Sequence, residues 1–128
     1  MSAESVKSDI IGIEEQIQSV NERIQELRNR YSTFELFDQK NRHKLVRECL
    51  AIIEPALNNN FQKIDSIIAS INKLGPNNEM TELKSRLLLS MKKVNTALEE
   101  IASNGNEKSR GMAIALQSKV SGYINKLS

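Results

Sequence analysis

The sequence predicts an all-α fold, an antiparallel bundle of about four helices with two long heptad-patterned helices. Along two stretches apolar residues recur at alternating steps of four and three, which puts them on one stripe of a helix, here called a seam. The first seam consists of Val6, Ile10, Ile13, Ile17, Val20, Ile24, Leu27 and Tyr31. The second consists of Val46, Leu50, Ile53, Leu57, Asn60, Ile64, Ile67, Ile71 and Leu74. No stretch alternates with a period of two, so the sequence predicts helices packed against helices.

The first helix is expected from about Glu4 to Tyr31. At ~1.5 Å per residue it would be on the order of 40 Å long. Ser32 and Glu35 have the spacing of a capping box, in which each side chain bonds the backbone N–H of the other residue. The chain is therefore expected to turn after Tyr31 and to return antiparallel to the first helix.

The second helix is expected from about Asp38 to Leu74, and it contains two local conflicts. Pro55 removes a helical hydrogen bond, and the side chains of the asparagine run 58–60 compete for the backbone. Because the seam keeps its phase through both, a kinked continuous helix is favoured over two helices separated near the asparagines. Asn60 then either lies buried in the seam, where it would set register or oligomeric state, or belongs to a solvated break.

Gly75-Pro76 is expected to end this helix, because glycine suits the C-terminal cap and proline cannot continue. A third helix is expected over about 78–103, with Met80, Leu83, Leu87, Met91, Val94, Leu98 and Ile101 on its apolar side. After the turn at 104–106, a fourth is expected from Glu107 to Leu127. That helix spans only about 30 Å, so the longer helices should leave apolar seam uncovered at one end.

Length and composition predict one helical-bundle domain over residues 1–128. The net charge is only +2, and aromatic residues make up 4% without a tryptophan, which argues against nucleic acid as the partner. Cys49 is the only cysteine and the first residues lack the pattern of a signal peptide. We therefore expect an intracellular protein, in the cytoplasm rather than the nucleus, and no run approaches the ~18 apolar residues of a transmembrane segment.

The sequence contains no residue grouping typical of catalysis or metal binding. His43 is the only histidine, and a helix would separate it from Cys49 by roughly 240° of rotation. Cys49 flanks the second seam, where a small buried hydrophobe is the favoured interpretation over a nucleophile. We therefore expect no enzymatic activity, no cofactor and no metal site.

The densest charge feature is the basic cluster Lys40, Arg42, His43, Lys44 and Arg47, with no acid between 40 and 47. Lys40, Lys44 and Arg47 fall on one side of the predicted helix and are called the basic stripe below. One interpretation is a solvated face paired with acids of the first helix. The other is a contact site for an acidic protein, an anionic lipid surface or nucleic acid, with Lys40, Arg42, Lys44 and Arg47 as the candidate partner-binding residues.

A likeness to a known family is carried by three C-terminal segments. They are Val94-Asn95-Thr96-Ala97-Leu98-Glu99-Glu100-Ile101, Gly105-Asn106-Glu107-Lys108-Ser109-Arg110 and Val120-Ser121-Gly122-Tyr123-Ile124-Asn125-Lys126-Leu127. These segments resemble the last two helices of the BAG domain, a three-helix co-chaperone module, and the resemblance implies binding to the Hsp70 ATPase. That family makes its contact with an acidic residue, an Arg-Lys pair and a glutamine. In this chain the corresponding positions hold Ala102, Met112-Ala113 and Ser121, so the contact set is missing.

The expected function is a non-enzymatic protein–protein interaction module, either a subunit or adaptor of a larger intracellular assembly or a homo-oligomer. The first alternative is a BAG-like co-chaperone of Hsp70. The second is a peripheral membrane or nucleic-acid binder that acts through the basic stripe.

Overall fold

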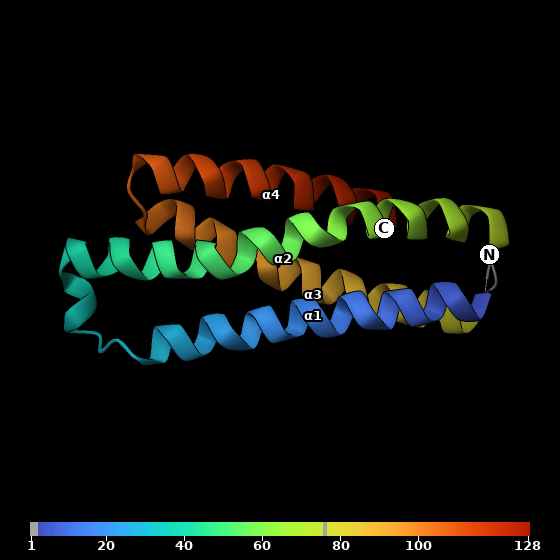
Figure 1. Ribbon diagram of the computed structural model, residues 1–128, viewed down its shortest axis with the longest axis horizontal. Helices are drawn as coiled ribbons and strands as arrows, with labels where there is room; N and C mark the ends of the chain where they lie inside the picture. Colours follow the sequence, from blue (N-terminus) through green and yellow to red (C-terminus); the bar gives the residue numbers. More distant parts are fainter. Residues whose placement is uncertain (1–2, 76) are drawn as a thin grey trace.

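The computed structural model of the protein describes residues 3–75 and 77–128. Four α-helices contain most of these residues: α1 (Ala3–Asn29), α2 (Gln39–Leu74), α3 (Asn78–Asn104) and α4 (Glu107–Leu127). A short 3₁₀ helix, η1 (Glu35–Phe37), joins α1 to α2 (Figure 1). The predicted all-α bundle is confirmed, and no strand occurs in the described residues.

Successive helices run in opposite directions, but they are not arranged around the bundle in chain order. Helix α1 packs against α2 and α3, and α4 also packs against α2 and α3, whereas no contact joins α1 to α4 within the described residues. Helices α1 and α3 are therefore parallel neighbours, and the connection from α2 to α3 crosses the diagonal of the bundle (Figure 1).

The predicted seams form most of the core. From Val6 to Leu27 every seam residue of α1 is buried, and so is every seam residue of α2 from Val46 to Ile67. Helices α3 and α4 supply Met80, Leu87, Met91, Val94, Leu98, Ile101, Ala113, Leu116, Val120 and Leu127. The α2 seam becomes less buried toward its end, where Leu74 is 42% exposed.

The first helix ends at Asn29, two residues earlier than predicted. The N–H groups of Arg30 and Tyr31 donate to carbonyls only three residues back, each at 3.2 Å, so the last turn tightens before the chain leaves the helix. Tyr31 therefore does not extend the seam. Its ring is half-buried beyond the helix, and its hydroxyl donates to Glu48 at 3.2 Å.

Helix α2 is continuous through both predicted conflicts. Pro55 lies on the exposed side. Asn60 is only 2% exposed, and its Nδ2 donates to Gln16 Oε1 at 2.8 Å and to the Ala56 carbonyl at 2.6 Å. The continuous-helix prediction is thus confirmed and Asn60 lies in the seam against α1. Gly75, at a φ of 77°, follows the last residue of α2, while the predicted role of Pro76 falls outside the described residues.

Ion pairs join the parallel helices α1 and α3 at matching positions. Lys7 pairs with Glu79, Glu14 with Arg86 at 3.0 Å, and Arg28 with Glu100 at 3.0 Å. The paired residues lie seven and then fourteen residues apart on each helix, so the same offset between α1 and α3 forms all three pairs. If α1 shifted along α3 by seven residues, either Lys7 would face Arg86 or Glu14 would face Glu79, and the two like charges would repel. The ion pairs therefore favour the observed alignment of α1 with α3.

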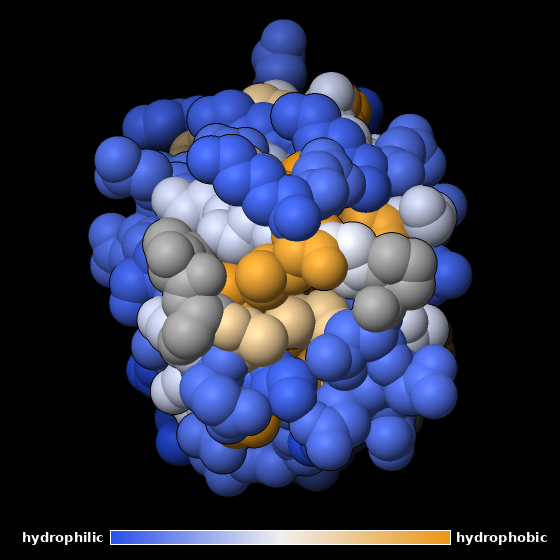
Figure 2. Space-filling model, turned by 90° about the vertical axis from the view of Figure 1, so that its right-hand side faces the viewer, coloured by the Kyte–Doolittle hydropathy of each residue, from blue (hydrophilic) through white to orange (hydrophobic). Residues whose placement is uncertain are grey.

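The two ends of the bundle differ. At one end, called the corner end, η1 joins the end of α1 to the start of α2, and at the same end α3 finishes and α4 begins (Figure 1). At the other end, called the open end, α4 stops short of the ends of α2 and α3 and of the start of α1 (Figure 1). Figure 2 shows apolar side chains in the middle of the open end, within a polar surround. Ile71 and Leu83 are half-buried, which agrees with the predicted uncovered seam.

Candidate interaction surfaces at the corner end

The corner between α1 and α2 is held by a dense set of hydrogen bonds. Ser32 N donates to Glu35 Oε1 and Glu35 N donates to Ser32 Oγ, both at 3.0 Å, which confirms the predicted capping box. Arg42 Nη1 reaches back from α2 and donates to the carbonyls of Leu36 and Phe37, each at 2.9 Å. The corner is therefore fixed to the first turn of α2.

Two phenylalanines project from this fixed corner. Phe34 is 83% exposed and Phe37 is 75% exposed, which makes them the most exposed large apolar residues described. They are three residues apart around a 3₁₀ turn, so their side chains leave on the same side. The sequence analysis missed this pair. The sequence could have predicted them, because Phe34 and Phe37 are three residues apart in the turn between the two seams and belong to neither.

The basic stripe lies on the outer side of α2. Lys40, Lys44 and Arg47 are exposed, whereas Val46 and Cys49 on the opposite side of the helix are buried. No ion pair within the described part of the chain involves any of the three basic residues. The stripe is therefore a solvated face, as the first interpretation has it, but the expected ion pairs with acids of α1 are absent from the described residues. As a contact site the stripe stays a prediction.

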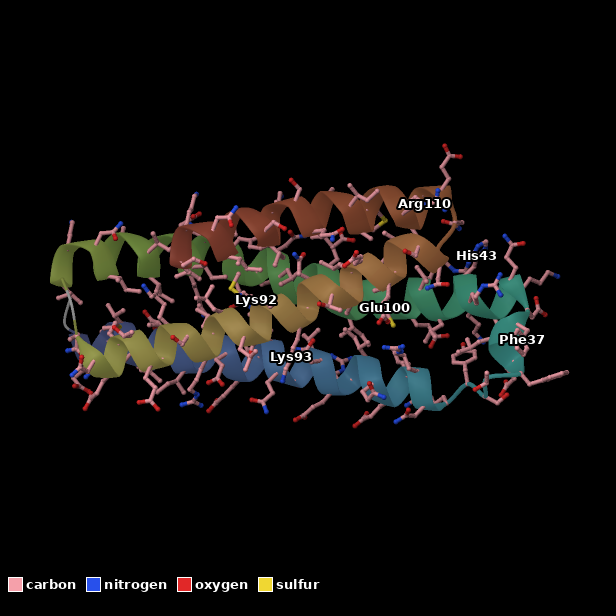
Figure 3. The ribbon with its side chains drawn as sticks, turned by 180° about the vertical axis from the view of Figure 1, so that it is seen from behind. Phe37, His43, Lys92, Lys93, Glu100 and Arg110 are labelled. Carbon is pink, nitrogen blue, oxygen red and sulfur yellow. The ribbon has the colours of Figure 1, made fainter. Side chains whose placement is uncertain are left out.

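Arg42, also predicted to bind a partner, differs from the stripe. It is half-buried, and its guanidinium is used to hold the corner. His43 is half-buried on the first turns of α2, and Figure 3 shows it and Phe37 at the same end of the bundle as Arg110, in the first turn of α4. The structure therefore divides the predicted basic cluster between an inner structural residue and an outer stripe.

An apolar groove, called the corner groove, opens where α1, η1, α2 and α3 meet. Its volume is about 190 Å³. Apolar lining residues are Ile24, Leu36, Leu45, Val46, Cys49 and Ile101. Charged groups of Arg28, Arg42 and Glu100 also line it, and Arg28 pairs with Glu100. Four of the apolar residues belong to the buried core, so the core opens toward solvent here.

Cys49 lies in the wall of this groove and is 3% exposed. Burial raises the pKa of its thiol to about 11, so little thiolate is present at neutral pH. This agrees with a small buried hydrophobe. Among the residues that the structure describes, no three His, Cys, Asp or Glu side chains gather in a way that could hold a metal ion.

The positions aligned with the BAG contact residues lie mostly inside this bundle. Ala113 is fully buried in the core. Ser121 is half-buried, and its hydroxyl accepts a hydrogen bond from Asn95 Nδ2 at 3.0 Å across the α3–α4 interface. These positions therefore serve packing between α3 and α4.

Comparisons with family models, with curated proteins and with solved structures found no match to this chain. None of the helices in residues 3–75 and 77–128 combines the length and apolar character needed to cross a membrane.

Proposed function

We propose that this protein is a non-enzymatic protein–protein interaction module, a subunit or adaptor of a larger assembly, and that it holds a segment of its partner in the corner groove. The observation that carries the proposal is a concave opening of the apolar core at the corner end, between residues of four elements. A concave, largely apolar site with a few charged groups is the usual form of a specific binding site.

The charged lining indicates the chemistry of the partner. The Arg28 guanidinium is paired with Glu100, whereas Arg42 contacts only neutral backbone carbonyls. An acidic group could therefore approach Arg42 without displacing a carboxylate. The expected partner segment carries a leucine-sized or aromatic side chain for the groove and an acidic residue beside it.

The test begins with capture from the native cell by the wild-type chain and by the Leu45→Ser variant. Leu45 is half-buried and lines the groove, so its truncation to serine removes apolar contact. The matched control is Leu88→Ser, which changes a half-buried leucine of α3 that does not line the groove. A partner lost from Leu45→Ser and retained by Leu88→Ser is then purified, and its dissociation constant is measured with all three proteins.

We expect Leu45→Ser to weaken binding about tenfold, which corresponds to loss of roughly one buried apolar side-chain contact. Cys49 offers a direct reporter, because bound partner should slow the reaction of this single cysteine with a thiol reagent. Equal affinity for both variants, together with unchanged Cys49 reactivity in the complex, would rule out the groove as the binding site.

A further inference from the structure

We propose that the corner tip, defined as Phe34, Phe37 and the basic stripe, docks on an anionic lipid membrane. The two rings would enter the interfacial region of the bilayer while Lys40, Lys44 and Arg47 contact acidic headgroups. This inference goes beyond the proposed function and does not depend on it, because the corner groove opens on the other side of α2 and neither phenylalanine lines it.

The first argument is the position of the tip. Figure 1 shows η1 and the start of α2 extending past the turn between α3 and α4, so the corner is the outermost part of this end. Side chains on a protruding point can enter a soft, flat bilayer. Both rings are highly exposed, so they can enter a bilayer without any change in the fold.

The second argument is the local charge. Residues 30–47 contain five lysines or arginines against two acids. Both carboxylates are already engaged with the backbone, Glu35 accepting from Ser32 N and Asp38 accepting from Lys40 N at 3.0 Å each. The positive groups of the stripe have no such partner in the described residues. A surplus of unpaired cations beside exposed apolar groups matches the surface of an anionic leaflet.

The third argument is reach. The stripe extends seven residues from Lys40 to Arg47, or about 10 Å along the helix, which is comparable to the ~8–10 Å range of the membrane potential in physiological salt. Flexible lysine and arginine side chains shorten the remaining distance. All three charges can therefore act on the same leaflet that receives the rings.

Binding is tested by co-sedimentation of the full chain with phosphatidylcholine vesicles that contain roughly 30% phosphatidylserine, and with phosphatidylcholine vesicles alone. We expect binding to the anionic vesicles at low salt, with loss at high salt. Each lysine or arginine strengthens such binding about fivefold, so the Lys40→Gln, Lys44→Gln, Arg47→Gln triple variant should bind on the order of 100-fold more weakly.

The matched charge control is the triple variant Lys63→Gln, Lys73→Gln, Lys92→Gln, which removes the same charge from exposed positions away from the tip. It should lose much less binding. Equal loss in the two triple variants would mean that only net charge matters, and it would overturn the proposal.

Insertion of the rings is tested separately, because the chain contains no tryptophan. In Phe37→Trp, a single tryptophan should report entry into the bilayer by a blue shift of its emission on anionic vesicles. Leu89→Trp is the control, since Leu89 is 58% exposed on α3 and should stay in water. The double variant Phe34→Ser, Phe37→Ser should bind at least about tenfold more weakly while circular dichroism shows an unchanged fold.

Three results would overturn the proposal. The first is no sedimentation with anionic vesicles at low salt. The second is binding without a blue shift in Phe37→Trp and without loss in the double serine variant. The third is binding of a DNA duplex or an acidic protein that the tip variants abolish, while the vesicles are not bound. None of these affects the groove test, because the tip variants leave Leu45 and Cys49 unchanged.

Discussion

The corner end and the open end both expose apolar side chains, but for different structural reasons. At the corner end, Phe34 and Phe37 are presented on a 3₁₀ turn that hydrogen bonds hold against α2. At the open end, Leu74 is exposed because the seam of α2 continues after α4 has ended. The first arrangement requires specific local contacts, whereas the second follows from a difference in helix length.

The two ends therefore differ in how their apolar side chains come to be exposed. At the corner end local hydrogen bonds hold the rings in place, whereas at the open end a seam is left uncovered by a shorter helix. At the corner, Arg42 donates its hydrogen bonds to the backbone of the turn, and the exposed rings lie beside cations that form no ion pair in the described residues. At the open end the neighbouring charges Lys7 and Glu79 are paired with each other. Both proposed contact surfaces lie at the corner end, and the predictions below test whether the two ends differ in stability as well as in surface.

The largest expected effect is a difference in the loss of unfolding free energy when one leucine toward each end of the bundle is replaced by alanine. Leu98 is completely buried toward the corner end, so Leu98→Ala should cost about 2–5 kcal/mol of unfolding free energy through lost packing and a cavity. Leu74 is 42% exposed, so Leu74→Ala should cost less than about 1 kcal/mol. Urea unfolding of both variants measures the difference, and similar costs would show that the open end is covered in solution.

The next largest effect concerns the corner itself. Arg42→Ala removes both hydrogen bonds to the corner carbonyls and should cost about 1.5–3 kcal/mol. Its control is Lys44→Ala two residues further along α2, which removes an exposed cation and should change stability by less than about 0.5 kcal/mol. Hydrogen exchange should also accelerate over residues 32–38 in Arg42→Ala. Unchanged exchange there would mean that the capping box alone holds the corner.

Much of the bundle could be predicted because its seams are local patterns. The seam spacing identified every buried position of α1 except Glu14 and seven of the ten buried positions of α2. The predicted start of α3 and both ends of α4 also agree with the structure. Asn60 was placed correctly as one of two alternatives, since the unbroken phase of the seam outweighs the preference of asparagine for turns. The early end of α1 depends on the tightened turn at Arg30 and Tyr31, which has no clear apolar signature.

The order of helices around the bundle and the candidate surfaces could not be predicted in the same way. Packing α1 beside α3 depends on contacts between residues such as Glu14 and Arg86, far apart in the chain. The corner groove brings together Ile24, Leu45 and Ile101 from three helices, so no single segment contains its pattern. The role of Arg42 also depends on where the corner carbonyls point, which the charge pattern alone does not contain.

A smaller effect is expected midway between the two ends. Asn60→Leu replaces a buried amide with apolar packing and should raise stability by about 1 kcal/mol. The two acceptors that lose their bond to Asn60 can still form hydrogen bonds. Gln16 is exposed to water, and the Ala56 carbonyl lies within a continuous helix. Thermal unfolding and light scattering would measure stability and mass. A less stable variant, or one of altered mass, would indicate that Asn60 fixes the register of α1 on α2.

The smallest effect should be a pH dependence confined to the open end. The hydrogen bond and charge of Lys7 lower the pKa of Glu79, and Glu79 in turn raises the pKa of Lys7. A lowered carboxyl pKa in the folded state gives stability that is present above the unfolded value and is lost as pH falls through the folded value. A raised lysine pKa gives stability that is lost only as pH rises beyond the unfolded value of 10.5. The pair should therefore contribute between about pH 5 and pH 10.

Replacing Glu79 with glutamine should thus lower the melting temperature slightly at pH 7, and this effect should shrink in acid as the pH falls through the lowered pKa of the folded carboxyl. The control is Glu82→Gln, which removes an exposed carboxylate on the same turn of α3 that forms no ion pair within the described residues. Because Glu79 is mostly exposed, added salt should reduce the difference at pH 7. A change that persists in acid below this pKa, or in high salt, would mean that Glu79 acts through packing at the end of the bundle, and the open end would then be more ordered than its exposed seam indicates.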